Sequence, residues 1–368
     1  MIYTIKKKLQ FLFKKFFYGL FKIIYNEIKD FESAETNINT RVEISKIEEN
    51  FSYKVFFVNK SRIYTDTIND TAIIQNNKII EGPSFQIRNF KFNSVKENIV
   101  FTKGTPRIKK KVNGILLSLL TGGAGNDNYW HWLFDVLPRI QIVKKIIDTN
   151  KINFFLFPNI EKNFQKETLD LLNIPQEKRL SSKIDRHIES DQIILTEHPY
   201  VLNNDASNEI QNLPSWLINW LKKTFIQRLN LADANFPKKI YIDRSDASPN
   251  IKKYRKIINE NEIINEVKRA DYKNIILSDF SFRDQMKFFF NATNIVGLHG
   301  AGFANLVFGN PGSKILELKP SHAGDVIKNL AEKCGLNYNC ISVIPEKFNL
   351  NNQLGHIKID IEDFKKYL

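Results

Sequence analysis

A histidine and an aspartate four positions apart, His131 and Asp135, stand in the segment GNDNYWHWLFDVLPRI (125–140). If a helix begins near Asp127 or Asn128, their side chains share one face, one turn apart. A carboxylate beside an imidazole orients the ring and raises its basicity, as activation of a hydroxyl nucleophile requires. The pattern leaves open whether the base is His131, supported by Asp135, or Asp135 itself. It also leaves open a polar helix face on which His131 only forms a hydrogen bond.

The position of this pair in the chain favours a functional site. The pair follows a buried strand predicted over 114–121 and the glycine-rich turn Gly122-Gly123-Ala124-Gly125-Asn126. Sites in α/β proteins lie at the carboxyl ends of strands. Arg139, a further turn along, is expected to be less securely placed because Pro138 disturbs the last turn.

The segment NIVGLHGAGFANLVF (294–308) predicts a second site, one for an anion. A predicted buried strand leads into His299, Gly300, Ala301 and Gly302, after which a helix begins. Small residues let backbone N–H groups approach an anion, and a helix N-terminus adds partial positive charge. The alternative is a tight turn that needs glycine for packing alone. The segment matches neither a Walker loop nor GxGxxG, and a histidine stands where a serine hydrolase needs serine, so these classes are disfavoured.

Three charged residues fit such an anion site. Glu317 ends a predicted strand, KILEL, 17 positions after Gly300, where a carboxylate is placed to bind ribose hydroxyls. Arg244 ends the predicted strand 238–244, and Arg255 follows in a basic stretch. Two guanidinium groups would neutralise a nucleotide diphosphate through forked, charge-assisted hydrogen bonds. The alternative for both is an ordinary surface arginine.

The sequence predicts chemistry without a bound metal. The chain contains no Asp-x-Asp, no His-x-x-x-His and no Cys-x-x-Cys. These are spacings by which carboxylates, imidazoles and thiolates commonly hold divalent ions. Two cysteines, Cys334 and Cys340, cannot build a zinc site or a disulfide framework.

The hydrophobic pattern predicts two α/β blocks. Short strand-like runs at 53–58, 71–75, 78–82 and 98–102 precede a strand–helix alternation that begins near 113. The alternation predicts strands at 114–121, 152–157, 192–196, 238–244, 274–278, 294–298 and 314–318, and helices at 161–173, 214–229, 281–291 and 322–334. We therefore expect an α/β protein with two Rossmann-like domains facing across a cleft. The expected organisation is a basic amphipathic helix (1–29), a β-rich N-terminal extension (30–112), a first Rossmann-like domain (113–205), a linker helix (206–236), a second Rossmann-like domain (237–345) and a C-terminal tail (346–368).

The first 30 residues are basic and amphipathic. They carry seven lysines against Glu27 and Asp30, in a chain whose net charge is +14. At about 100° per residue, one arc of the helix holds apolar residues and the other holds lysines. The apolar arc contains Ile5, Leu9, Leu12, Phe13, Phe16, Phe17, Leu20, Ile23 and Ile24. This pattern predicts a helix lying in an anionic bilayer surface, and the alternative is a helix packed on its own domain.

Three blocks of this chain resemble glycosyltransferase family 61: NYWHWLFDVLPRI, IDRSDA…RKIINENE and VGLHGAGFANLVFGNPGSKILEL. They stand in that family's order and cover about 113 to 345. The resemblance implies a GT-B architecture and inverting, metal-independent transfer from a nucleotide sugar. It also implies that the C-terminal domain binds the donor and the preceding domain the acceptor. The carried-over donor residues are Arg244, Arg255, His299, Gly300, Gly302 and Glu317, and the carried-over acceptor-side residues are His131 and Asp135.

The expected protein is therefore a glycosyltransferase that needs no cofactor other than its donor, for which we expect a UDP-sugar. Bacterial members that the chain resembles are mostly assigned to capsule or other surface-polysaccharide assembly, which implies a glycan or lipid-linked acceptor. With residues 1–29 on an anionic membrane, the enzyme would be peripheral on the cytoplasmic face of the inner membrane. The alternative, motivated by a pI near 9.4, is a basic protein that binds nucleic acid or anionic lipid without catalysis. Since the charge concentrates in the first helix, we expect no nucleic-acid partner.

Overall fold

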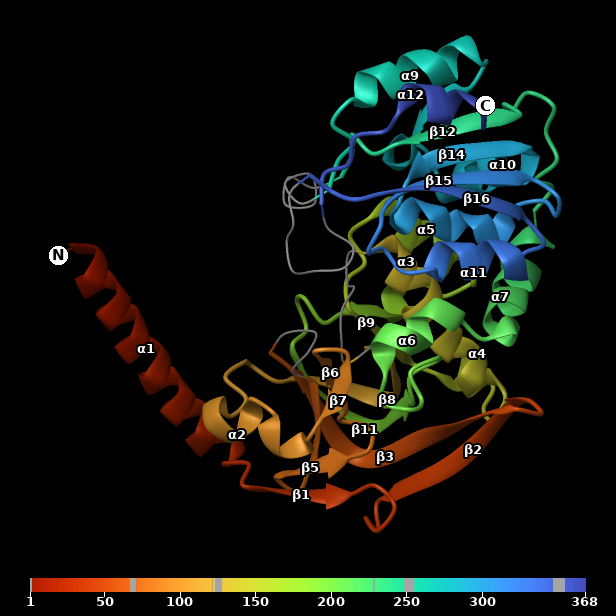
Figure 1. Cartoon of the computed structure of the whole chain (residues 1–368). Helices are drawn as coiled ribbons and strands as arrows, with labels where there is room; N and C mark the ends of the chain where they lie inside the picture. Colours follow the sequence, from red (N-terminus) through yellow and green to blue (C-terminus); the bar gives the residue numbers. More distant parts are fainter. Residues whose placement is uncertain are drawn as a thin grey trace. The chain divides into compact units, whose positions relative to one another are not determined.

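The computed structural model describes residues 2–66, 71–120, 122, 128–227, 229–247, 255–346 and 355–368, with side chains from residue 6 onward. The chain divides into two compact units. Figure 1 colours the chain along the sequence, from the N-terminus in red to the C-terminus in blue. Unit 1 comprises Met1–Asp127, His131–Glu161 and Asn173–Ala206. Unit 2 comprises Asn128–Trp130, Lys162–Leu172 and Ser207–Leu368. The chain passes between the units several times, so neither is one continuous stretch of sequence.

Helix α1 (Ile2–Tyr25) forms where the amphipathic pattern predicts a helix. Asn26, with a φ of 61°, directly follows its last residue, and asparagine in this conformation commonly terminates helices. The apolar arc is exposed: Leu9, Leu12, Phe13 and Phe16 keep 59–66% of their surface open. The packing alternative requires this arc to be buried against the protein. The described residues do not bury it.

The last turn of α1 is held firmly to unit 1. Arg62 donates from Nη2 to the backbone oxygen of Tyr25 at 3.1 Å, and the Tyr25 ring packs edge-on against His187 with centroids 4.9 Å apart. Arg62 also contacts Nε2 of His187 at 3.0 Å. The helix is thus mounted by its C-terminal end, while its N-terminal turns present their apolar arc to solvent.

A nine-stranded mixed sheet forms the core of unit 1. Its strand order is β1-β5-β4-β3-β11-β8-β9-β10, and β2 also pairs with β3. The bounds are β1 Asp30–Ser33, β2 Thr40–Glu48, β3 Phe51–Thr65, β4 Thr71–Gln75, β5 Lys78–Glu81, β8 Lys110–Ser118, β9 Phe154–Phe157, β10 Arg179–Ser181 and β11 His187–Thr196. A separate hairpin joins β6 (Gln86–Arg88) to β7 (Lys91–Asn93).

This sheet joins the extension 30–112 and the domain 113–205, which we expected to be separate. Strand β3 pairs antiparallel with β11 over nine residue pairs, and β11 pairs parallel with β8. The apolar side chains Val58, Leu116 and Ile193, one from each of these three strands, belong to one buried cluster. The strands of 113–205, which we expected to form a Rossmann-like domain, therefore belong to a mixed sheet, because the long strand β3 pairs antiparallel with β11.

One short run predicted as a strand is helical. Residues 98–102 were assigned to a strand, but α2 spans Val100–Lys103. The Asn98 side chain accepts the N–H of Val100 at 3.2 Å, and Gly104 ends the helix with a φ of 65°. A local side-chain cap and a left-handed glycine outweigh the β-branched composition here.

Unit 2 contains a five-stranded, all-parallel sheet with the order β13-β12-β14-β15-β16. Its strands are β12 Lys239–Asp243, β13 Lys273–Ile276, β14 Asn294–Leu298, β15 Lys314–Pro320 and β16 Asn337–Val343. The strand order reverses at β12, which lies between β13 and β14. This arrangement has the strand order of a Rossmann-like fold, in which ligands bind beyond the carboxyl ends of the strands flanking the reversal.

The helices of unit 2 surround this sheet, and α9 and α12 lie together beside it (Figure 1). Their bounds are α5 Asn163–Leu171, α7 Ser215–Leu221, α9 Glu260–Arg269, α10 Phe282–Asn291, α11 Val326–Lys333 and α12 Ile361–Lys365. A π-helix, Lys222–Ile226, continues α7, and a 3₁₀-helix, Ala301–Phe308, follows β14. Helix α5 belongs to unit 2, although the sequence places it within 113–205.

The described part of the C-terminal segment is not a detached tail. Ile357, Ile359 and Phe364 are 0–1% exposed and belong to the core cluster of unit 2. Ile357 also forms a parallel bridge with Ile257. The α/β class is confirmed, and residues 355–368 are part of the second fold unit rather than an appendage.

Candidate active site

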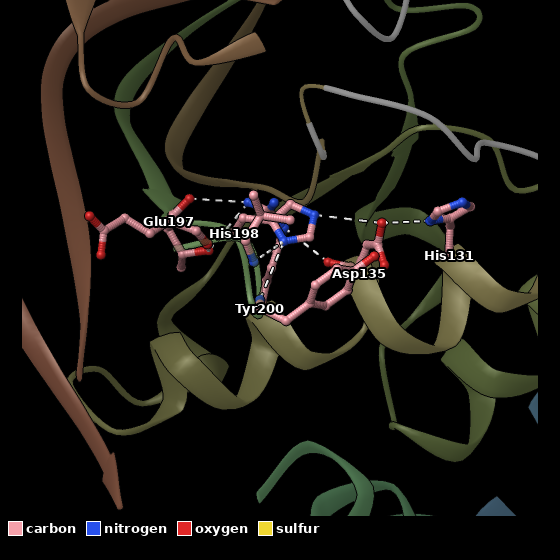
Figure 2. A network of polar contacts seen from close by, with 8 residues as sticks. His131, Asp135, Glu197, His198 and Tyr200 are labelled. Carbon is pink, nitrogen blue, oxygen red and sulfur yellow. Dashed lines mark hydrogen bonds and ion pairs between the residues drawn. The ribbon is translucent and has the colours of Figure 1, made fainter. Parts of the chain in front are cut away.

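The carboxylate of Asp135 lies between two histidines (Figure 2). Its Oδ2 is 2.7 Å from Nδ1 of His131 and 3.6 Å from Nε2 of His198. The first contact is a hydrogen bond, and the second is a longer electrostatic contact. The side chains of Asp135 and His198 are 5% and 2% exposed, whereas His131 is 19% exposed. His131 is therefore the member of this group that solvent or a substrate reaches.

A π-helix presents this group. The segment Trp132–Val136 widens the helix, and the N–H of Leu137 donates to the oxygen of Trp132 at 3.1 Å. Pro138 follows and has no N–H to donate, so one bond of the regular helical ladder is missing at this point. Single π-turns of this kind are frequent at functional sites.

Arg139 is firmly held, contrary to the expectation that Pro138 leaves it insecure. Its Nε donates to the backbone oxygen of Asp135 at 3.0 Å, and its Nη1 donates to the backbone oxygen of Thr196 at 3.1 Å. It is 1% exposed. The arginine thus ties the π-helix to the end of β11, from which His198 follows two residues later.

The tautomer of His198 follows from its neighbours. Its Nδ1 accepts the backbone N–H groups of Tyr200 and Val201 at 3.3 and 3.1 Å. The proton must therefore be on Nε2, the nitrogen that faces Asp135. Burial lowers the pKa of His198, and the charge of Arg139 adds to this against the pull of Asp135. His198 is thus a neutral donor toward Asp135.

These surroundings raise the pKa of His131 and lower the pKa of Asp135. Burial alone would raise the pKa of Asp135, but His131 and His198 outweigh it and hold that pKa well below its usual range. Burial alone would lower the pKa of His131, but the charge and hydrogen bond of Asp135 outweigh it and raise that pKa. Since Asp135 is ionised, Nδ1 of His131 carries a proton and Nε2 is the basic nitrogen. The geometry thus favours His131 over Asp135 as the group that accepts a proton.

His198 was not among the residues that the sequence indicated. The signal that could have found it is its position, since it lies two residues beyond the carboxyl end of β11. The glycine-rich turn 122–126 lies outside the described residues except for Gly122, as does the proposed helix start at Asp127. Gly122 has a φ of 66°, and a Cβ there would come within 2.5 Å of the Phe85 oxygen, so this position requires glycine.

A second group gathers where β12 and β14 end, at the reversal of strand order in unit 2. Arg244 follows β12 and donates from Nη1 to the backbone oxygen of His299, which follows β14. A Cβ on Gly300 would lie 2.8 Å from the guanidinium carbon of Arg244. A Cβ on Gly302 would lie 2.9 Å from Leu277. Gly300 therefore makes room for the guanidinium, and Gly302 makes room for the packing of the 3₁₀-helix.

Glu317 holds His299 instead of facing outward. One of its oxygens is bonded to Nδ1 of His299, and the other accepts the hydroxyl of Tyr338 at 2.5 Å. The carboxylate is 0% exposed. Glu317 was expected to bind ribose hydroxyls, but both its oxygens are engaged within the protein. Its register opposite Gly297 on β14 brings its side chain to the histidine.

Arg244 and Arg255 form a site of concentrated positive charge. Burial, helped by the charge of Arg244 and opposed by the attraction of Glu317, lowers the pKa of Arg255 to about 9. Burial likewise lowers the pKa of Arg244. Both groups remain charged at neutral pH, so an anion bound between them would relieve the cost of holding one buried and one half-buried cation close together.

Within the part of the chain that the structure describes, no three His, Cys, Asp or Glu side chains gather as metal ligands would. The polar groups found at the two sites are imidazoles, guanidinium groups and buried carboxylates with partners of their own.

The model of the glycosyltransferase 61 family matches residues 129–316. This stretch is half of the chain, and it holds His131, Asp135, His198, Arg244, Arg255 and His299. The chain belongs to this family, and it is a glycosyltransferase, EC 2.4.

Curated relatives agree over a shorter stretch. The chain is 30% identical over 90 residues to the EGF domain-specific O-linked N-acetylglucosamine transferase of Pan troglodytes, and 32% identical over 93 residues to that of Gallus gallus. Each alignment covers 23% of this chain and 17% of the relative. The chain thus matches about a sixth of the length of these relatives, and the bacterial polysaccharide context stays a prediction.

Replacing Asp135 by asparagine should change the pH dependence of transfer. Activity requires neutral His131, so it is lost as pH falls through the raised pKa of this histidine. Without the Asp135 charge, burial dominates and that pKa falls, so the acidic limb of kcat/KM should move to lower pH. The maximal rate should drop about 10²-fold or more, because the base is weaker and poorly oriented. As a control, His187→Gln removes another buried histidine of unit 1 and should leave the profile in place. If the pH dependence of kcat/KM does not move in Asp135→Asn, the base is a residue other than His131.

Replacing Gly300 by alanine should weaken the binding of a nucleoside diphosphate without unfolding unit 2. The new Cβ displaces the flexible end of Arg244, so the loss should approach that of Arg244→Ala, about 10- to 100-fold for a charge-assisted contact. Titration calorimetry with UDP measures it. Gly19→Ala is the matched control, since nothing lies within 4 Å of a Cβ there. Equal affinity in all three variants would remove Arg244 from the donor site.

Proposed function

We propose that this chain is an inverting glycosyltransferase that moves a sugar from a nucleotide-activated donor, a UDP-sugar, to a hydroxyl group of a glycan acceptor. The observation that carries the proposal is the pair of guanidinium groups, half-buried Arg244 and buried Arg255, at the strand-order reversal of unit 2. A diphosphate leaving group carries the negative charge that such a pair attracts. The base group of His131, Asp135 and His198 supplies the complementary half of the reaction.

In the proposed reaction, Nε2 of His131 takes the proton of the acceptor hydroxyl. The oxygen forms a bond to the anomeric carbon while the bond from that carbon to the diphosphate oxygen breaks on the opposite face. The configuration at the anomeric carbon is therefore inverted. The electron pair of the broken bond stays on the diphosphate, where Arg244, Arg255 and the backbone at 300–302 stabilise it. His299, held by Glu317, lines the same position.

No metal enters this scheme, because the two guanidinium groups provide the positive charge that a divalent ion supplies elsewhere. In the same scheme Glu317 acts through His299, since both carboxylate oxygens already have partners. We assign Glu317 as a positioning residue of the donor site and Asp135 as the positioning residue of the base.

The acceptor that we propose is a lipid-linked glycan of surface-polysaccharide synthesis, and α1 is the feature that motivates it. The helix exposes a row of large apolar side chains beside lysines, as helices at an anionic bilayer surface do. None of the described helices is both long and apolar enough to cross a bilayer. We therefore place the enzyme peripherally on the inner face of the cytoplasmic membrane, where a lipid-linked acceptor would be confined to the same surface.

A nucleotide screen tests the proposed donor. UDP should raise the melting temperature more than GDP or CMP does, and excess EDTA should leave that rise unchanged relative to Mg²⁺. A random oligonucleotide should give no comparable rise, whereas a basic nucleic-acid-binding protein would prefer it. A rise that appears only with Mg²⁺ or Mn²⁺ would overturn the metal-independent scheme.

Membrane attachment is tested on the two faces of α1. Phe16 and Phe11 are each 66% exposed but lie about 140° apart around the helix, since successive residues turn by about 100°. Phe16→Glu should abolish sedimentation with vesicles of phosphatidylglycerol and phosphatidylcholine, whereas Phe11→Glu, on the lysine side, should reduce it less. Salt should weaken binding without removing it, because the apolar contact is not screened. Equal loss in both variants would show charge attraction alone.

The same reasoning predicts the behaviour of a chain that starts at Tyr18, which lacks most of the apolar arc but keeps Tyr25 and the buried Ile28. It should keep the melting temperature and nucleotide response of the full chain, since the apolar arc of α1 covers no core, and it should lose vesicle binding. A sharp fall in its melting temperature would support the alternative in which α1 packs on the protein.

A further inference from the structure

Unit 1 contains a pocket of about 260 Å³ that the proposed reaction does not yet use. It is lined by the end of β5, the β6–β7 hairpin and the segment after β11, with Phe85, Phe92, Asn93, Glu81, Glu197 and His198 among its residues. The volume lies just below the range of about 300–1,000 Å³ typical of small-molecule sites. A pocket of this size suits one ring rather than a nucleotide.

Aromatic side chains form one side of this pocket. Phe85 and Phe92 meet edge to face with centroids 5.5 Å apart, and both are half-buried. Aromatic faces carry negative charge in their π-systems and attract weakly positive C–H groups. The axial C–H groups of a pyranose ring form such a surface. Phe85 also lies against Gly122, and the neighbouring Ile87 N–H donates to the Gly122 oxygen at 2.6 Å.

Carboxylates and an amide supply the polar part of the lining. Oε2 of Glu197 accepts the backbone N–H of Lys54 at 2.7 Å, which orients the carboxylate and leaves Oε1 for a further donor. Burial raises the pKa of Glu197. Glu81 and Asn93 add acceptors, and no lysine or arginine is among the described lining residues, although the Arg139 guanidinium carbon lies 5.6 Å from the centroid of the Phe85 ring. In a chain with a net charge of +14, this acidic lining repels a phosphate and favours neutral hydroxyl donors.

His198 connects the pocket to the base. Its ring lines the pocket, while its Nε2 faces Asp135, which holds His131. Figure 2 shows this row, with His198 between Glu197 and Asp135 and with His131 beyond Asp135. A ligand in the pocket therefore shares a wall with the group proposed to deprotonate the acceptor.

We propose that this pocket is an acceptor subsite that binds one neutral sugar ring of the acceptor glycan. The ring stacks on Phe85 and Phe92, and its hydroxyl groups donate to Glu197 and Glu81. This inference rests on the proposed glycosyl transfer, since it names where part of the acceptor binds. The donor stays assigned to Arg244 and Arg255 in unit 2, where the lining has the opposite charge.

Binding of simple glycosides to the full chain tests the subsite. The probes are methyl β-glycosides of glucose, galactose, xylose and N-acetylglucosamine, measured by saturation-transfer NMR and titration. At least one should bind, with the strongest transfer on ring C–H protons. Phe92→Ala should abolish the transfer, and Glu197→Gln, which keeps an acceptor for the Lys54 N–H, should weaken binding about tenfold.

Two matched variants control for indirect effects. Phe90→Ala removes an exposed phenylalanine from the same hairpin but outside the pocket lining, and Glu35→Gln removes another carboxylate that contacts Lys54. Both should bind the glycoside as the unmodified chain does. Titration of every variant with UDP measures the affinity of the donor site independently of glycoside binding.

The outcomes separate the subsite from the function. If UDP binds but no glycoside does, or if glycoside binding survives both Phe92→Ala and Glu197→Gln, the pocket is not an acceptor subsite, and the proposed transfer is untouched. If a glycoside binds and the pocket variants lose it while UDP fails to bind, the sugar subsite stands and the donor assignment falls. If inorganic phosphate competes with the glycoside for the pocket, the assignment of a neutral sugar as the ligand is also overturned.

Discussion

A buried carboxylate is stable as an anion only where positive charge or hydrogen-bond donors replace the lost water. Asp135 meets this requirement with His131 on one side and His198 on the other, and the rest of unit 1 is arranged to keep them there. Arg139 ties the π-helix to β11, and backbone N–H groups after β11 determine the tautomer of His198. The result is one histidine that is polarised and accessible, and one that is neutral and enclosed.

Unit 2 also contains a buried carboxylate that orients a histidine, but with different partners. Glu317 is a second fully buried carboxylate, and its partners are His299 and the hydroxyl of Tyr338. Here burial and the neighbouring arginines lower the pKa of the histidine, with the bond to Glu317 opposing them. In both units a carboxylate inside the fold orients an imidazole, but the net pKa shift is upward for His131 and downward for His299. The difference lies in the surrounding charge, which is positive around His299.

The distribution of charge separates the surfaces that different ligands would use. Guanidinium groups gather at the strand-order reversal of unit 2, carboxylates and phenylalanines line the pocket of unit 1, and lysines concentrate on α1. A uniform basic surface would attract any polyanion. Segregation of this kind instead suits a protein that handles a phosphorylated donor, a neutral hydroxyl-rich acceptor and an anionic lipid surface.

Local sequence patterns determined much of this protein. Alternation of apolar runs predicted β12, β14 and β15 within a few residues, and three blocks, around His131, Arg244 and His299, together indicated the family. The tertiary structure decided that the N-terminal strands share a sheet with β8, that His198 joins Asp135, and that Glu317 serves His299. These outcomes depend on which strands pair and in which register. Periodicity reports only the face that each residue occupies on its own element, so contacts between distant segments became visible only when the sheets were assembled.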